Sequence, residues 1–317
     1  MKRLFKQRDF TFLLLALLLL GIVFFQPTIQ WKRDLHHYLL IVDITQSMNA
    51  TDMRLNGQAA SRLDYTRQLL GDAIARMPCG TKVSLGVFSA ETIALLFTPI
   101  EVCKNYDVIQ DSIANLEWRM AWRGNSRLRF GVQSAAALLS SLDTAAQVVF
   151  FTDGDEAPKL NAINKSDLSA WQGGKGWLIV GVGGDQPVPI PKLDSENKVL
   201  GYWAFSNSIM APSQVQSEES IGTRDDSIAT AEYDRYLSQL DETYLRELSA
   251  EIGATYLRAI TVDVLINKMK QQKPVAKERA EIDMSPFLIS AALLLVLACY
   301  SANLQSRFRH IFPKGQQ

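Results

Sequence analysis

Through the middle of the chain, short apolar runs alternate with segments whose apolar residues recur at helical spacing. Tyr38–Val42 is apolar at every position, which predicts a strand buried on both faces. Further strands are predicted at 148–152, 177–182 and 254–257, with a hairpin over 82–99. Helices are predicted over 61–77, 106–116, 128–142, 241–252 and 262–270, with a short helical piece at 168–171.

Alternating strands and helices predict an α/β fold. We expect a doubly wound, Rossmann-like and mainly parallel sheet with one antiparallel edge strand, contributed by the hairpin. The domain is expected to span residues 30–260, with an insertion carrying a second hairpin at 183–222 and a linker at 261–283.

Two uncharged apolar segments, 10–29 and 286–304, flank this domain. Each is close to the roughly 20 residues that cross a bilayer. A cleaved signal peptide is the alternative for the first, but bulky residues, Phe24–Pro27, stand where small ones are needed. We predict two transmembrane helices in a bacterial inner membrane. Both flanks, 1–9 and 305–317, are basic, which predicts that they are cytoplasmic and that the domain is periplasmic.

Charge is balanced over the whole chain, with Lys+Arg 33 and Asp+Glu 33. Because both ends are basic, the middle of the chain carries an excess of acidic residues. Nucleic-acid binding requires a basic surface, so the composition argues against that class of partner.

The cysteines fit a periplasmic domain. Cys79 and Cys103 lie on either side of the predicted hairpin, whose two open ends meet in space. A disulfide between them is geometrically suitable and stable in an oxidising compartment. Two unrelated buried thiols are the alternative. Cys299 lies inside the second apolar segment and is expected to act as a small apolar residue.

Side chains that carry oxygen follow several predicted strands. Asp43, Thr45 and Ser47 follow the first strand, Ser126 lies in a later turn, and Asp153 follows a central strand. The carboxyl ends of parallel strands meet at one edge of a sheet, so these side chains are expected to converge. An all-oxygen set suits a hard divalent cation, Mg²⁺ first and Mn²⁺ or Ca²⁺ next. Ordinary polar loops are the alternative.

Asp43-Ile44-Thr45-Gln46-Ser47, together with Asp153-Gly154, resembles the motif of the von Willebrand factor A (VWA) domain and its metal-ion-dependent adhesion site (MIDAS). The family has Ser where this chain has Thr45, and a loop Thr for which Ser126 is the candidate. The resemblance covers about residues 36–260. It implies that a partner protein supplies an acidic side chain to the metal.

A VWA domain between two spans is similar to bacterial membrane proteins encoded beside MoxR-type AAA+ ATPases. These include Bat aerotolerance proteins and accessory proteins of methanol dehydrogenase operons. Thr45–Met48, the cysteine pair and Asp153–Glu156 favour the second group. That resemblance implies maturation of, or metal insertion into, a periplasmic enzyme such as methanol dehydrogenase. A MoxR-type ATPase and other VWA membrane proteins are the implied partners. The alternative is a structural or stress-tolerance subunit, Bat-like, in which the metal only stabilises the fold.

Asp155 and Glu156, beside Asp153, also resemble an acid/base pair for hydrolysis. No nucleophile motif, phosphate loop or zinc signature accompanies them, so we expect a binding protein and no enzyme. Asp155 and Glu156 are expected to shape the rim of the metal site or to meet solvent, and they are candidate partner contacts. Trp122 and Arg123 are expected to contact a partner, because Trp and Arg are common at interfaces. Loop packing is the alternative for them.

Overall fold

The computed structural model describes residues 2–161, 165–203 and 236–311. It divides into two compact units, one formed by residues 35–276 and the other by the two ends of the chain, 1–34 and 277–317.

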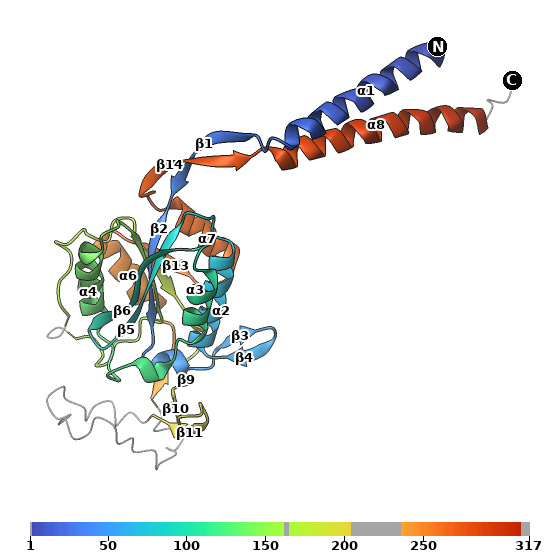
Figure 1. Cartoon of the computed structure of the whole chain (residues 1–317). Coiled ribbons are helices and arrows are strands. Elements are labelled where there is room, and N and C mark those ends of the chain that lie inside the picture. The colour runs from blue at the N-terminus through green and yellow to red at the C-terminus, as the bar shows by residue number, and fades with distance from the viewer. Residues whose placement is uncertain (1, 162–164, 204–235, 312–317) are drawn as a thin grey trace. The chain divides into compact units, whose positions relative to one another are not determined.

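The larger unit is built on a six-stranded sheet with the strand order β13-β8-β7-β2-β5-β6 (Figure 1). Its strands are β2 (His37–Asp43), β5 (Lys82–Ser89), β6 (Thr92–Glu101), β7 (Gln147–Thr152), β8 (Leu178–Gly181) and β13 (Thr255–Arg258). All neighbours are parallel except β5 and β6, which pair as an antiparallel hairpin. The predicted mainly parallel sheet with one antiparallel edge strand is therefore confirmed.

Strand β2 lies inside the sheet and is buried along its whole length. Tyr38, Leu40 and Val42 belong to one apolar core, whereas Leu39 and Ile41 belong to the other. Helices α2 (Arg62–Ala75), α3 (Tyr106–Ala114) and α7 (Val262–Gln271) cover the first face, and α4 (Leu128–Ser141) and α6 (Glu242–Ile252) cover the second (Figure 1). Because successive side chains of a strand point to opposite faces, a strand covered on both sides must be apolar throughout.

Local sequence signals set the ends of two helices. Ser61 caps α2, since its Oγ accepts a hydrogen bond from the backbone N–H of Asp64 at 2.9 Å. Gly253 ends α6 in the left-handed region, with φ 75°, where a residue without Cβ is least strained.

Three features of the larger unit differ from the sequence prediction. Helix α7 was assigned to a linker, but Leu265, Ile266 and Met269 bury its apolar side in the domain core. A small hairpin, β3 (Met53–Leu55) and β4 (Gln58–Ala60), was not predicted. The expected helical piece at 168–171 is a single turn, with the Trp171 N–H bonded to the Leu168 carbonyl.

The insertion contains the predicted hairpin, formed by β10 (Pro191–Leu193) and β11 (Val199–Tyr202). A second short pairing joins β9 (Val188–Pro189) to β12 (Leu237–Ser238). The remainder of the predicted insertion, from residue 204 on, lies outside the described residues.

In the smaller unit, the two ends of the chain associate. Strand β1 (Thr28–Leu35) pairs with β14 (Ala276–Asp283), and helices α1 (Lys2–Val23) and α8 (Ser285–Ile311) lie side by side (Figure 1). β14 falls in the predicted linker. Its many charged residues do not show the apolar alternation of a strand, so it was not predicted as a strand of this two-stranded ribbon. The predicted spans 10–29 and 286–304 overlap α1 and α8. Among residues 2–161, 165–203 and 236–311, no helix has the length and apolar character needed to cross a membrane.

Candidate metal centre

The carboxyl ends of β2, β5 and β7 lie next to one another, because β2 pairs in parallel with both neighbours. This edge carries five side chains, which together we call the metal edge. They are Asp43, Thr45, Ser47, Ser126 and Asp153, all buried. The chain leaves β2 at Asp43 and enters the short helix η1 (Gln46–Asn49).

The carboxylate of Asp43 is surrounded by hydroxyl donors. Its Oδ1 accepts from the Thr45 N–H at 2.9 Å and from Thr45 Oγ1 at 2.6 Å. Its Oδ2 accepts from Thr152 Oγ1 at 2.7 Å. Burial, and then the nearby Asp153 carboxylate, raises the pKa of Asp43 to about 7, despite these hydrogen bonds. Asp43 therefore binds a proton far more tightly than an exposed aspartate does.

Two serine hydroxyls lie at the same edge. Ser47 Oγ is 3.4 Å from Thr45 Oγ1. The backbone of Ser126 exchanges two hydrogen bonds with Ala157, which follows β7. On its other side, Ala90, at the end of β5, bonds the residues flanking Ser126. The backbone thus fixes Ser126 between two strand ends, and its buried Oγ has no hydrogen-bond partner among the described residues.

Asp153 is bound by a buried arginine that the sequence analysis did not single out. Arg62 Nη1 donates to Asp153 Oδ2 at 2.7 Å, and both side chains are fully buried. The other oxygen, Oδ1, accepts from the Asp155 N–H at 2.9 Å. Burial raises the pKa of Asp153, and the positive charge of Arg62 opposes that rise. No sequence signal marks Arg62, because an arginine in the first turn of a helix is normally exposed.

These side chains fit a divalent cation. The set contains only oxygen, the ligand type that Mg²⁺, Mn²⁺ and Ca²⁺ prefer. Thr45 donates its hydroxyl proton to Asp43, and Ser47 Oγ lies 3.4 Å from Thr45 Oγ1. Both hydroxyl oxygens therefore keep lone pairs for a cation. The unpartnered Oγ of Ser126 offers a third such oxygen.

The comparisons with known proteins identify the domain that carries these residues. Residues 38–156 match the model of the von Willebrand factor type A domain. The chain contains a VWA domain. The match spans β2 to the loop after β7, and so includes the whole metal edge.

The chain is also similar to solved structures. The conserved hypothetical protein BatB of Bacteroides thetaiotaomicron is similar with a TM-score of 0.51 and 15% identity, over 74% of this chain and 98% of that one. An aerotolerance-related membrane protein of Bacteroides fragilis has a TM-score of 0.49 and 18% identity, over 75% and 98% of the two chains. At such identities the likeness concerns the fold alone. No curated protein matches the sequence.

Two residues predicted to contact a partner lie in the loop between η2 (Trp118–Met120) and Ser126. Trp122 is 43% exposed and Arg123 is also exposed. The loop is tied to the VWA domain where Ser89 Oγ donates to the Arg123 carbonyl at 2.9 Å. Trp122 and Arg123 are thus accessible to a partner.

Asp155 and Glu156 lie inside the VWA domain, which corrects the expectation that they meet a partner or solvent. Glu156 Oε1 accepts from the Leu128 N–H at 3.0 Å, at the start of α4, and from Tyr244 Oη at 2.6 Å. Asp155 Oδ1 is bound by Lys159 and lies 3.3 Å from Tyr236 Oη. Burial is the main cause that raises the pKa of Glu156. Both carboxylates therefore serve the fold.

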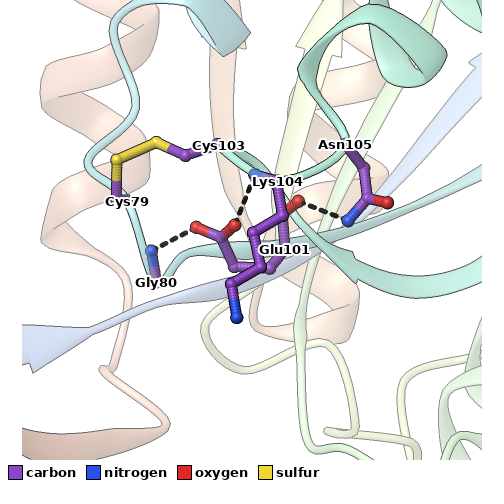
Figure 2. Close-up of a disulfide and its surroundings, with 6 residues drawn as sticks. All are labelled: Cys79, Gly80, Glu101, Cys103, Lys104 and Asn105. Carbon is purple, nitrogen blue, oxygen red and sulfur yellow. Dashed lines mark hydrogen bonds between the residues drawn. A yellow bond between two sulfur atoms is a disulfide. The ribbon is translucent and has the colours of Figure 1, made fainter.

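The structure contains a disulfide between Cys79 and Cys103, the pair that the sequence predicts, with a Cα–Cα distance of 5.2 Å (Figure 2). Figure 2 shows Glu101 beside it, where the carboxylate accepts from the backbone N–H groups of Gly80 and Lys104 at 2.5 and 2.7 Å. This cluster of two sulfurs and a carboxylate is accounted for by the bridge and by backbone hydrogen bonds. We assign it a structural role.

A surface groove of about 630 Å³ lies between the β3–β4 hairpin and helices α2 and α3. Charged and amide side chains, including Arg67, Asp72 and Gln110, line it. None of the metal-edge residues contributes to this groove, so we do not assign it to the metal site.

Proposed function

We propose that this VWA domain captures a partner protein through a divalent cation held at the metal edge, with Mg²⁺ the best-suited ion and Mn²⁺ or Ca²⁺ as substitutes. The observation that carries the proposal is the set of neutral hydroxyl oxygens at the metal edge. Thr45 Oγ1 donates its proton to Asp43 and keeps its lone pairs for the cation, Ser47 Oγ lies 3.4 Å from it, and the buried Ser126 Oγ has no hydrogen-bond partner among the described residues. Neutral ligands do not cancel the charge of a cation, which therefore still attracts a carboxylate from a partner.

The loop after η2 supports a protein as the ligand. Gly124 lies against the side chain of Gln46 in η1, so this loop borders the metal edge. Trp122 is 43% exposed on this loop and Arg123 is exposed beside it, while Met120, the last residue of η2, is 38% exposed. An acidic residue flanked by apolar side chains is the partner feature that would fit these neighbours.

We propose binding without turnover. Asp155 and Glu156, the carboxylates suited in sequence to acid/base chemistry, are buried and hold Lys159, Tyr244 and the start of α4. A general acid or base must reach the substrate, and these groups face the interior of the fold.

The smaller unit supports attachment to a membrane. Helices α1 and α8 lie side by side, yet many of their large apolar side chains are exposed. These include Leu13, Leu14, Leu17, Leu18, Phe287, Leu293, Leu294 and Leu297. Leaving apolar surface in water costs about 25 cal/mol per Å². We propose that a bacterial inner membrane covers it, with the VWA domain in the oxidising periplasm, where a disulfide such as Cys79–Cys103 persists.

Two cellular roles are compatible with such an anchored domain. The motif resemblance favours maturation of, or metal insertion into, a periplasmic enzyme such as methanol dehydrogenase, assisted by a MoxR-type ATPase. In the second role the protein is a Bat-like structural or stress-tolerance subunit, in which the metal only stabilises the fold. Fold similarity to BatB is compatible with either role.

The two roles are separated by partner capture. The purified full-length protein, in detergent, would be mixed with a periplasmic extract in Mg²⁺ or in EDTA, and bound proteins identified. We expect Mg²⁺-dependent capture that Asp43→Ala abolishes. Thr45→Ser is the matched control that keeps the hydroxyl, whereas Thr45→Val removes it at nearly constant volume.

Capture that survives Asp43→Ala, in a protein shown by calorimetry to have lost Mg²⁺ binding, would overturn the binding role and leave the structural one. Circular dichroism of each variant separates loss of capture from loss of folding.

A further inference from the structure

Arg62 is fully buried and hydrogen-bonded through all three of its guanidinium nitrogens. Nη1 donates to Asp153 Oδ2 at 2.7 Å and to Ser238 Oγ at 2.8 Å. On its other side, Nε and Nη2 donate to the carboxylate of Asp52 at 2.7 to 3.1 Å. Nη2 also donates to the Ser238 carbonyl at 3.2 Å. The planar guanidinium is therefore held between two carboxylates.

The surroundings of Arg62 leave it little room to shift. Gly183 passes so close that a Cβ there would lie 2.9 Å from Arg62 Nε. The Gly184 N–H donates to Asp52 at 2.9 Å and so fixes the carboxylate that holds the guanidinium. The side chain of Arg62 is therefore held in one position, because moving it would break several buried hydrogen bonds together.

The fixed position of Arg62 limits which carboxylate oxygens of Asp153 are free to bind a metal. Oδ2 is paired with Arg62, and Oδ1 accepts from the Asp155 N–H. For Asp153 to bind a cation directly, it would have to leave the guanidinium or share one oxygen between two positive charges. Each alternative is costly at a fully buried site, where like charges are poorly screened.

We propose that Arg62 is a positioning residue that keeps Asp153 out of direct metal coordination. The hydroxyl oxygens of the metal edge would then hold the cation, and Asp153 would stay bonded to Arg62 and to the Asp155 N–H. Because Arg62 withholds an anionic ligand, the cation is bound more weakly and needs a partner carboxylate more. This inference rests on the proposed function and identifies what makes the site dependent on a partner.

The test uses Mn²⁺ as the probe with the purified full-length protein in detergent. Calorimetry measures the affinity, and water-proton relaxation counts the water molecules bound to Mn²⁺. Asp153→Asn keeps the shape of the side chain and leaves Arg62 in place. Because Asp153 is not a metal ligand in this proposal, we expect the number of water molecules on Mn²⁺ to stay unchanged. Arg62→Met frees Asp153, so we expect roughly tenfold tighter Mn²⁺ binding and one fewer bound water. Arg62→Lys keeps the charge but loses the planar group that bonds both carboxylates, so we expect an Mn²⁺ affinity between those of the wild type and Arg62→Met.

Arg62→Met leaves Asp52 and Asp153 without a counter-charge and therefore risks unfolding. Arg62→Met combined with Asp52→Asn removes one buried negative charge, and thermal unfolding checks each variant. If neither variant folds, the Asp153→Asn water count decides the question by itself.

The inference is overturned if Asp153→Asn gains a bound water, because Asp153 is then a direct ligand. It is also overturned if a folded Arg62→Met protein binds Mn²⁺ no more tightly than the wild type. If the wild type binds no Mn²⁺ at all, the proposed function itself fails. The two failures are thus distinguishable.

Discussion

At the scale of the residue, the metal edge consists of polar groups that are buried and bonded to one another. Asp43 accepts from Thr45 and Thr152, while Asp153 is paired with Arg62. Burying a carboxylate without such partners costs several kcal/mol, so every group at this edge depends on its neighbours. Only Ser126 Oγ and Asp155 Oδ2 lack a partner among the described residues of this edge and its loop.

The raised pKa of Asp43 makes the metal-free protein sensitive to pH. Folded Asp43 keeps its proton up to about pH 7, whereas in the unfolded chain the pKa returns towards the ordinary value of 3.8. Between these values the unfolded state binds fewer protons. The free energy of unfolding should therefore fall as the pH rises from about 4 to about 7. Urea unfolding of the metal-free protein at pH 5 and pH 8 measures this change.

A cation at the metal edge replaces the proton of Asp43, so Mg²⁺ should stabilise the protein more at pH 8 than at pH 5. Asp43→Asn cannot ionise and should lose most of this pH dependence. A metal-free wild type that grows more stable between pH 5 and pH 8 would contradict the assignment.

At the scale of the element, the β5–β6 hairpin forms the antiparallel edge of the sheet. β6 is an edge strand, and its only pairing in the described sheet is with β5. Cys79 precedes β5 and Cys103 follows β6, so the disulfide joins the open ends of the hairpin. Glu101 reinforces the same end by accepting from backbone N–H groups of both segments. The bridge therefore holds the edge strand in place.

Removing this disulfide should destabilise the VWA domain. The bridge closes a loop with a sequence separation of 24, and loops of this size typically contribute about 2–4 kcal/mol. We expect the double variant Cys79→Ser/Cys103→Ser to lose roughly that much free energy of unfolding, measured by urea titration. A reducing agent should lower the stability of the wild type to the same level and leave the double variant unchanged. Equal stability of oxidised wild type and double variant would contradict this role.

At the scale of the whole molecule, the chain combines a VWA domain with a unit made from its two ends. The ends meet because β1 pairs with β14 and α1 lies beside α8. A ribbon of two strands is marginally stable alone in water, and the helices expose much apolar surface. An environment that covers those helices would stabilise the smaller unit.

If that environment is a membrane, the full-length protein should remain in the membrane pellet after extraction with alkaline carbonate. Variants with Asp at two exposed positions, Leu17→Asp and Leu294→Asp, should be extracted more easily, because a buried charge is costly in lipid. Substitution of the exposed Lys104 in the VWA domain should have no such effect and serves as a control. Protease added to spheroplasts should digest a periplasmic VWA domain. Complete extraction of the wild type by carbonate would refute the anchor.

The amino-acid sequence by itself determined the class of the fold. The strand at 38–42 is apolar at every position, and helices alternate with strands, so the mainly parallel, covered sheet could be predicted from local pattern alone. It also predicted the antiparallel edge strand and the cysteine pair. The members of the metal edge were identified because each follows a strand or lies in a turn at the same edge. Their metal binding stays a prediction.

Local pattern failed where long-range contacts override it. The charged β14 forms a strand because β1, far away in the sequence, supplies its hydrogen bonds. Helix α7 is part of the domain because its apolar side meets the core next to α2. Neither partner is visible from the segment itself.

Only the tertiary structure decided which charged groups are paired at the metal edge. Arg62 and Asp153 are separated by 91 positions, and folding brings their side chains within 2.7 Å. Glu156 follows a strand end as Asp153 does, yet Tyr244 and the start of α4 hold it in the interior. Sequence shows which residues leave a strand at a given edge, because strand direction is local. Which charges then meet depends on packing, because burial and pairing arise only between segments distant in the chain.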